Sequence, residues 1–180
     1  MSSTSTAKPG PNPWRLRLLT SSEALPLAAE IWTCYDQVFG DFGDYATWRS
    51  DLFARHAGRD GFRLAAATDD DQMIGFAWGY LGRRGQYWSD LVYEALPHDV
   101  ASKWVGNHFE FVELAVLPAY RGNGLGRALH DLLLDGVRRP CLLSTSDEPD
   151  DPAVHLYTRS GWKSLGTLRP GVQVMGHDRT

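Results

Sequence analysis

The chain has 180 residues, of which 43% are hydrophobic and 22% are charged, and its formal net charge is −4 at pH 7. This length supports one domain with a sizeable core, and no apolar run approaches the roughly 18 residues that a membrane span needs. Because nucleic-acid surfaces normally require clustered basic residues, the acidic balance argues against such a partner as well.

The first 13 residues are rich in Ser, Thr, Pro and Gly and lack the apolar centre of a signal peptide. We expect residues 1–13 to form a disordered leader and residues 14–177 to form one domain. Cys34 and Cys141 are far apart in the sequence and indicate no disulfide framework. The expected location is therefore the reducing cytoplasm.

The first half of the chain predicts a strand, two helices and a β-hairpin. Thr20 and Glu23 have the spacing of a capping box, and Pro26 favours a slightly later start of the first helix. The hairpin is indicated by two apolar runs on either side of an acidic turn. In chain order the elements cover residues 14–19, 20–39, 46–56, 62–68 and 73–81.

The second half begins with residues 82–106, which are rich in aromatic and charged side chains and are expected to be irregular. Asp151 and Pro152 predict the start of the last helix, and Gly161 predicts its end. Strands are expected over 111–117, 141–145, 162–167 and 172–175, and helices over 125–137 and 151–160. The order β-α-α-β-β-β-α-β-α-β-β predicts a single α/β domain with a mixed central β-sheet flanked by helices.

A glycine-rich segment, Arg121 to Gly126, joins a strand to a helix, an arrangement that holds phosphate. The free N–H groups and the dipole of the helix N-terminus attract an anion, and glycines let the backbone approach it. The sequence lacks a P-loop, and Arg127 or Leu129 stands where a dinucleotide-binding loop needs its last glycine. An Arg-x-x-Gly-x-Gly pattern is present instead.

This pattern, with the preceding Leu-Ala-Val-x-Pro-x-Tyr over residues 114–120, resembles the acyl-CoA-binding motif of the GNAT superfamily of N-acyltransferases. The string Ala-x-x-Leu-Tyr-x-x-x-Gly-Trp over 153–162 is similar to a second family string, and the predicted element order matches the family's fold. The resemblance covers about residues 14–177 and is weak in the first half. The donor-binding residues that it implies are Leu114, Ala115, Val116, Arg121, Gly122, Asn123, Gly124, Leu125, Gly126 and Arg127.

The resemblance implies an N-acetyltransferase that uses acetyl-CoA as co-substrate in a direct ternary mechanism. It assigns Val116 as the residue nearest the thioester carbonyl and Tyr157 as the acid that protonates the departing thiolate. One position departs from the family pattern, since Asp150 stands where an asparagine often contacts the donor, and a carboxylate repels phosphate. The six histidines show no ligand spacing, so no metal is expected.

Two glutamates are candidates for the general base. The resemblance implies a catalytic glutamate at Glu110, and Glu113 is the rival because it interrupts an apolar run. Period-two alternation puts the two side chains on opposite faces of the strand. Burial would raise the pKa of either carboxyl and suit it to accept a proton near neutrality. A third alternative, in which the amine proton passes directly to water, stays open.

The acceptor is an unidentified primary amine of a small molecule or a peptide. In the family, the loop after the first helix and the loop before the glycine-rich motif's strand line the acceptor pocket. Carboxylates among aromatic side chains in these loops suit a cationic amine, although they also suit solvated acids above packed rings. These residues are Asp36, Phe39, Asp41, Phe42, Asp44, Tyr45, Trp48, Tyr87, Trp88, Asp90, Tyr93 and Glu94. A non-catalytic CoA-binding or sensing module is the alternative function, and a homodimer stays open.

Overall fold

The computed structural model describes residues 14–180, so the leader expected over residues 1–13 lies outside the described part of the chain. Seven strands form one sheet in the order β1-β2-β3-β4-β5-β7-β6. Neighbouring strands are antiparallel, except that β4 and β5 are parallel. The strands are Arg15–Thr20 (β1), Arg63–Asp69 (β2), Gln72–Gly82 (β3), His108–Val116 (β4), Cys141–Ser146 (β5), Lys163–Arg169 (β6) and Val172–His177 (β7).

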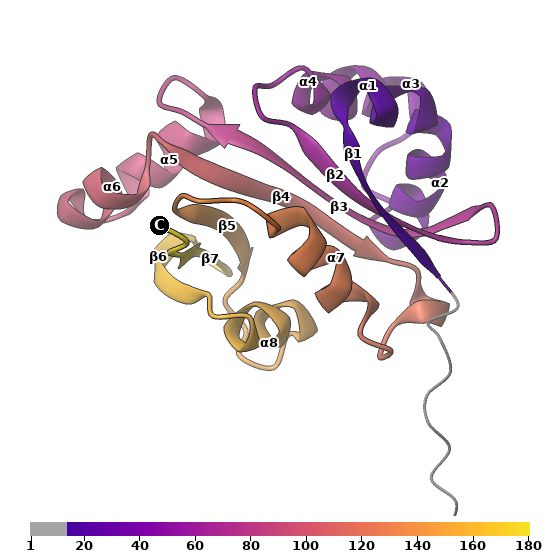
Figure 1. The fold of residues 1–180 in the computed structure, drawn as a ribbon. Coiled ribbons are helices and arrows are strands. Elements are labelled where there is room, and N and C mark those ends of the chain that lie inside the picture. The colour runs from indigo at the N-terminus through magenta and orange to yellow at the C-terminus, as the bar shows by residue number, and fades with distance from the viewer. Residues whose placement is uncertain (1–13) are drawn as a thin grey trace, which may run out of the picture.

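Helices flank this sheet on both faces, which confirms the expected mixed α/β class (Figure 1). Phe76 of β3 packs on Tyr35, whereas its neighbour Gly75 faces Leu129, so the helices that carry Tyr35 and Leu129 cover opposite faces. The helices are Ser21–Ala24 (α1), Ala28–Val38 (α2), Tyr45–Trp48 (α3), Ala54–Ala57 (α4), Tyr87–Ala95 (α5), His98–Trp104 (α6), Leu125–Leu134 (α7) and Pro152–Arg159 (α8).

The helical segment after β1 begins directly after Thr20, earlier than Pro26 led us to expect. The Thr20 N–H donates a hydrogen bond of 2.8 Å to Oε2 of Glu23, as the capping-box spacing predicts. Pro26 lies in a 3-10 turn, Leu25–Leu27, that joins α1 to α2. Because proline is tolerated at the start of a helical turn, the chain accommodates it by dividing the expected helix into short pieces.

The segment over residues 82–106, expected to be irregular, instead forms α5 and α6. Trp88, Val92 and Leu96 follow one another at the i, i+4 spacing of a helix, but scattered aromatic and charged residues obscure this stripe in the sequence. The two helices pack on β5 and β7 through a second apolar cluster, separate from the main core. The cluster's buried members are Val92, Leu96, Ala101, Leu142 and Val174. The element order therefore contains two helices between β3 and β4 that were not predicted.

Strands β4 and β5 pair only near their N-terminal ends. Phe109 lies opposite Cys141 and Glu110 opposite Leu142, and no pair follows along the described strands. On its other side, β4 stays paired with β3 as far as Val116. The side of β4 that faces β5 therefore presents backbone groups without a strand partner, as expected for a strand that diverges from its neighbour.

β4 also contains a β-bulge at Val112. Across the β3–β4 pair, Trp78 lies opposite Glu113, and the next residue, Gly79, lies opposite Phe111, so Val112 has no partner. An extra residue in one strand reverses the alternation of side chains beyond it. The bulge therefore decides which face of the sheet each side chain of β4 reaches.

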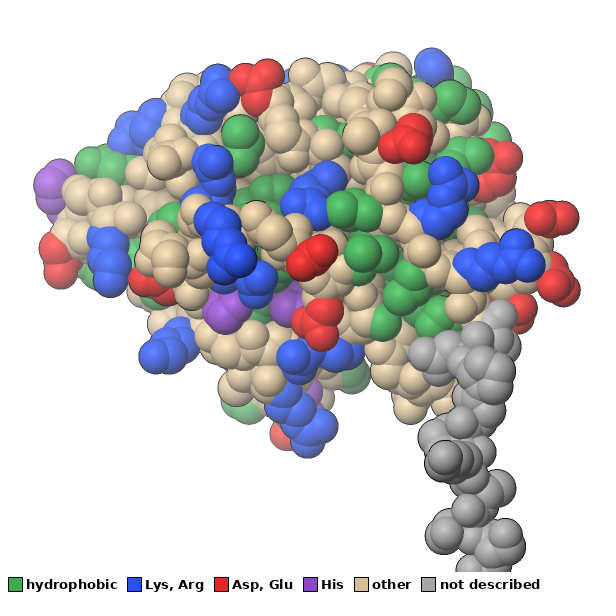
Figure 2. Space-filling model, in the orientation of Figure 1, with side chains coloured by type: hydrophobic (Ala, Val, Ile, Leu, Met, Phe, Trp, Pro, Cys, Tyr) green, Lys and Arg blue, Asp and Glu red, His purple; other side chains and the backbone are tan. Residues whose placement is uncertain are grey.

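Within residues 14–180, no helix combines the length and the apolar character needed to cross a membrane. Over the face seen in Figure 2, basic and acidic side chains are interspersed. The described residues contain no group of three or more His, Cys, Asp or Glu side chains placed to hold a metal ion. Both cysteines are buried free thiols.

Candidate active site

A groove of about 790 Å³ lies between β4, the N-terminus of α7 and the start of α8. Most residues that the sequence assigned to the acyl-CoA donor line this groove: Leu114, Val116, Arg121, Gly122, Gly124, Leu125, Gly126 and Arg127. Two assigned residues do not line it. Ala115 is buried opposite Phe76, and the Asn123 amide donates to the Arg121 carbonyl oxygen at 3.3 Å.

The glycine-rich loop has a backbone shape that requires glycine. Gly122 and Gly124 have φ angles of +78° and +82°, which other residues rarely adopt, and Gly124 is the N-cap of α7. At Gly126, a Cβ atom would come within 3.1 Å of Leu156 Cδ1, so glycine allows α7 and α8 to approach closely. The loop thus leads into a helix N-terminus whose first N–H groups are available to an anion.

Charged side chains on the groove wall also fit a phosphate-bearing ligand. Arg121, Arg127 and Arg159 line it. Arg121 Nε donates to the Val116 carbonyl oxygen at 3.0 Å, and Arg127 Nε contacts both carboxylate oxygens of Asp131 at 2.8 Å. Asp150, which stands where the family often has an asparagine, lines the same groove as the residues expected to hold the phosphates.

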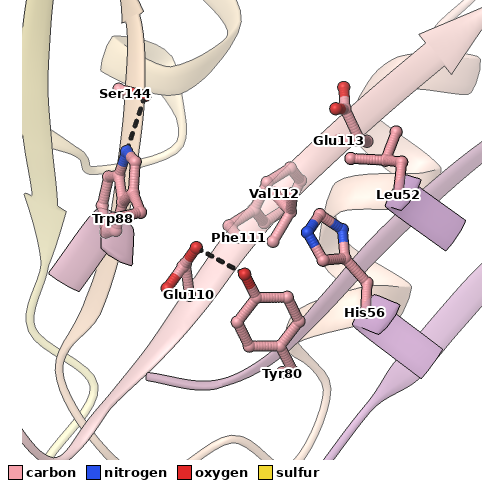
Figure 3. A pocket seen from close by; sticks show the side chains of 9 residues that line it. All are labelled: Leu52, His56, Tyr80, Trp88, Glu110, Phe111, Val112, Glu113 and Ser144. Carbon is pink, nitrogen blue, oxygen red and sulfur yellow. Dashed lines mark hydrogen bonds between the residues drawn. The ribbon is translucent and has the colours of Figure 1, made fainter. Parts of the chain in front are cut away.

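A second cavity, of about 280 Å³, lies on the other face of β4 (Figure 3). Glu110 and Glu113 of β4 line it, together with His56 of α4, Trp88 of α5 and Ser144 of β5. Helices α4 and α5, which come from distant parts of the sequence, thus form its walls. Tyr80 and Leu52 complete the set of lining side chains outside β4 and β5.

Glu110 is 4% exposed, and its Oε1 accepts a hydrogen bond of 2.8 Å from the Tyr80 hydroxyl. Its second oxygen, Oε2, is buried without a hydrogen-bond partner among the described residues. Burial raises the pKa of this carboxyl to about 7, against the lowering effect of the Tyr80 hydrogen bond. Glu110 can therefore exchange a proton near neutral pH.

Glu113 lies on the same cavity wall as Glu110, which corrects the expectation that the two side chains point to opposite faces. The bulge at Val112 is the cause, because it shifts the alternation by one residue between the two glutamates. Burial raises the pKa of Glu113 to about 8, and the negative charge of Asp41 adds to the increase. Two carboxyl groups that titrate near neutrality therefore share one cavity.

His56, Tyr80 and Ser144 were not predicted as site residues from the sequence. The Trp78 indole N–H donates to Nδ1 of His56 at 3.3 Å, and the Trp88 indole N–H donates to Ser144 Oγ at 3.2 Å. Burial lowers the pKa of His56 to about 4, and nearby arginines lower it further. Tyr80 lies in a strand of the predicted hairpin, but only the structure pairs that strand with the strand of Glu110.

Tyr157 projects from α8 and packs against Phe111, with ring centroids 5.8 Å apart, and against Trp162 at 5.9 Å. It lines neither cavity. Burial raises the pKa of its hydroxyl above the ordinary tyrosine range, and the carboxylate of Glu113 raises it further. The hydroxyl therefore stays protonated at neutral pH, as a proton donor must.

Of the loop acids and aromatic residues expected around the acceptor, Trp88 alone lines this cavity. Asp90 instead binds the Arg84 guanidinium at 2.7 Å, and Asp44 accepts from the Thr47 N–H at 2.9 Å as the N-cap of α3. Trp48 is fully buried in the main core. These residues have structural roles, and the carboxylates that face the cavity come from β4.

Comparison with known proteins identifies relatives of this chain. The model of the acetyltransferase (GNAT) family matches residues 25–162. A GCN5-like protein acetyltransferase of Mycobacterium tuberculosis is 34% identical over 109 residues, which are 56% of this chain and 53% of that protein. The match thus spans about half the length of this curated relative.

Solved structures share the fold at low sequence identity. A ribosomal-protein-alanine N-acetyltransferase of Escherichia coli is 16% identical, with a TM-score of 0.60 over 93% of this chain and 94% of that one. The PaiA N-acetyltransferase of Thermoplasma acidophilum, solved with coenzyme A, is 14% identical, with a TM-score of 0.57 over 92% and 98% of the two chains.

Proposed function

This chain belongs to the acetyltransferase (GNAT) family, and from that premise we propose that it transfers an acetyl group from acetyl-CoA to a primary amine, by direct attack in a ternary complex. One observation carries the proposal. The groove with the phosphate-type loop and the cavity with two carboxyls adjoin the same strand, β4. Donor and acceptor can therefore meet where β4 diverges from β5.

Acetyl-CoA supplies the acetyl group as a thioester. The N–H groups at the start of α7 would hold its pyrophosphate, with Arg121 and Arg159 near its other phosphate. The pantetheine arm would follow Leu114 and Val116 toward the opening between β4 and β5. The buried thiols of Cys34 and Cys141 support a reducing cytoplasm as the location.

Backbone N–H groups of β4 would polarise the thioester carbonyl. The Leu117 N–H points toward β3, because it donates a hydrogen bond of 2.9 Å to the Ile74 carbonyl oxygen. Since successive N–H groups of a strand point to alternate sides, those of Val116 and Leu114 point toward β5. The sequence favoured Val116 as the nearer donor. The order along the strand favours Leu114, because Leu114 directly follows Glu113 of the acceptor cavity.

Glu110 is the proposed general base. Its Oε2 has no hydrogen-bond partner within residues 14–180, and its pKa of about 7 lets it take a proton from the incoming ammonium group at neutral pH. The neutral amine nitrogen then attacks the carbonyl carbon, and the carbon–sulfur bond breaks. Tyr157 gives its hydroxyl proton to the departing thiolate. Its phenolate then takes up the proton that the attacking amine nitrogen releases. Glu113, with a pKa of about 8, is mostly uncharged at pH 7 before the acceptor binds and would accept a hydrogen bond from the amine beside Glu110.

Two assays test the proposal together. Calorimetry with acetyl-CoA measures donor binding, and a free-thiol readout measures transfer to a panel of primary amines. We expect binding and amine-dependent thiol release. Binding without thiol release for every amine in the panel would instead identify a non-catalytic CoA-binding module, and absence of binding at millimolar acetyl-CoA would contradict both functions.

A further inference from the structure

His56 is a polar side chain that lines the acceptor cavity beside the two glutamates, and it has no part in the proposed acetyl transfer. Its ring lies against the ring of Tyr80, with centroids 5.2 Å apart. Figure 3 shows one ring nitrogen directed into the cavity, between Glu110 and Glu113. The other nitrogen, Nδ1, lies 3.3 Å from the Trp78 indole nitrogen.

The Trp78 contact determines which nitrogen of His56 carries the proton. An indole N–H only donates hydrogen bonds, so Nδ1 must present its lone pair to it. A neutral imidazole then carries its proton on Nε2, the nitrogen that faces the cavity. Burial and the positive charges of Arg59 and Arg55 hold the pKa of His56 near 4, so the ring is neutral at physiological pH.

The cavity lining therefore contains both acceptors and donors of hydrogen bonds, and among them Tyr80 and Ser144 already have partners in Glu110 and Trp88. Glu110 Oε2 and the Glu113 carboxyl accept hydrogen bonds or a positive charge. His56 Nε2–H donates, and it has no hydrogen-bond partner among residues 14–180. A simple alkylamine would satisfy the carboxylates and leave this donor unpaired, which costs binding free energy in an enclosed site.

We propose that His56 is a specificity-determining residue, whose Nε2–H donates a hydrogen bond to an oxygen of the acceptor while Glu110 and Glu113 receive its amine. The preferred acceptor class is thus a primary amine that carries a hydrogen-bond-accepting oxygen a few bonds from its nitrogen. This inference rests on the proposed function for the identity of the cavity as the acceptor site.

The test uses two amines of the same size and shape, 3-methoxypropylamine and pentylamine, which differ by one ether oxygen. An ether only accepts hydrogen bonds, so it reports on the donor alone. Calorimetry on the CoA-loaded protein measures both dissociation constants. We expect the ether amine to bind roughly three- to tenfold more tightly, the range for one hydrogen bond. Equal affinities, or no binding of either amine, would overturn the inference.

Three variants locate the effect. His56→Phe removes the donor and keeps a ring against Tyr80, so the preference should disappear. His56→Gln restores an N–H near the position of Nε2 and should recover part of it. Arg49→Gln, at an exposed position seven residues earlier in the chain, should leave the preference intact. A preference that survives in His56→Phe would contradict the assignment.

Two further measurements separate this inference from the proposed function. The imidazole ¹⁵N spectrum of the unaltered protein should show the proton on Nε2 of His56, and a proton on Nδ1 would refute the inference without any variant. Thiol release from acetyl-CoA is then followed with the same two amines. Absence of release, with the binding preference intact, would count against acetyl transfer and leave the role of His56 supported.

Discussion

Tyr80 and Glu110 lie opposite each other across the β3–β4 pair, and the Tyr80 hydroxyl donates a hydrogen bond of 2.8 Å to Oε1 of Glu110. This bond lowers the pKa of a carboxyl that burial raises to about 7. The balance between the two effects places the titration of Glu110 near physiological pH. Tyr80 therefore adjusts the pKa of the proposed base from the wall of the same cavity.

Removal of that hydroxyl should shift the pH dependence of catalysis. Tyr80→Phe withdraws a hydrogen bond from the charged carboxylate, so the pKa of Glu110 should rise by roughly one unit. Because the base must be ionised, the acidic limb of the kcat/KM profile should move to higher pH. Tyr87→Phe, at a side chain that is 80% exposed, is the matched control and should leave the profile unchanged.

Glu110→Gln should reduce activity and increase stability. The folded protein binds the Glu110 proton more tightly than the unfolded chain does, with a pKa of about 7 against 4.5, so this carboxyl makes the fold less stable as pH rises through that range. The variant should gain about 3 kcal/mol of unfolding free energy at pH 8 and little at pH 4, measured with urea.

The same variant should lower kcat/KM roughly a hundredfold if Glu110 is the base. Glu113→Gln is the matched comparison, since it neutralises the other carboxyl in the cavity. A larger loss in Glu113→Gln would reassign the base to Glu113. Full activity in both variants would favour proton transfer directly to water.

Gly124→Glu should abolish donor binding. The substitution places bulk and negative charge at the N-terminus of α7, and the φ of +82° adds a strain of roughly 1–2 kcal/mol for any side chain. Gly171→Glu, in a remote turn with φ of +81° and no atom near its Cβ position, controls for this strain. Calorimetry with acetyl-CoA should separate the two, and unchanged affinity in Gly124→Glu would remove the loop assignment.

Tyr157→Phe should lower kcat roughly a hundredfold while the dissociation constant of acetyl-CoA stays the same. The ring contacts with Phe111 and Trp162 are kept, so the fold should be unaffected. Presteady-state thiol release and calorimetry measure the two quantities independently. Equal turnover in both proteins would exclude Tyr157 as the acid.

Trp88→Ala should widen the range of acceptors. The Trp88 indole bridges α5 to Ser144 of β5 at the cavity wall, so its removal should extend the cavity toward β5. We expect kcat/KM for bulky aromatic amines to rise roughly tenfold relative to that for small amines. A parallel change for both classes would indicate a general disturbance of the site rather than a limit on size.

Much of the architecture could be read from the sequence because its signals are local. The capping residues, the hairpin turn, the glycines before α7 and the Asp-Pro start of α8 each act on the few residues around them, and the structure contains all four features. Helices α5 and α6 were missed because their apolar stripe is sparse. It is buried by residues of β5, β6 and β7, among them Leu142 and Val174, which lie far away in the sequence.

By itself, the sequence determined the family and the order of strand and helix around the glycine-rich loop. It also indicated where the donor's phosphates would lie. All of these depend on short motifs with a fixed local geometry. Only the tertiary structure decided which residues line the proposed acceptor cavity. The bulge at Val112 turns Glu110 and Glu113 to one face, and long-range packing brings His56 and Trp88 beside them. Strand register and packing between distant segments arise from interactions across the whole fold, which no local pattern records.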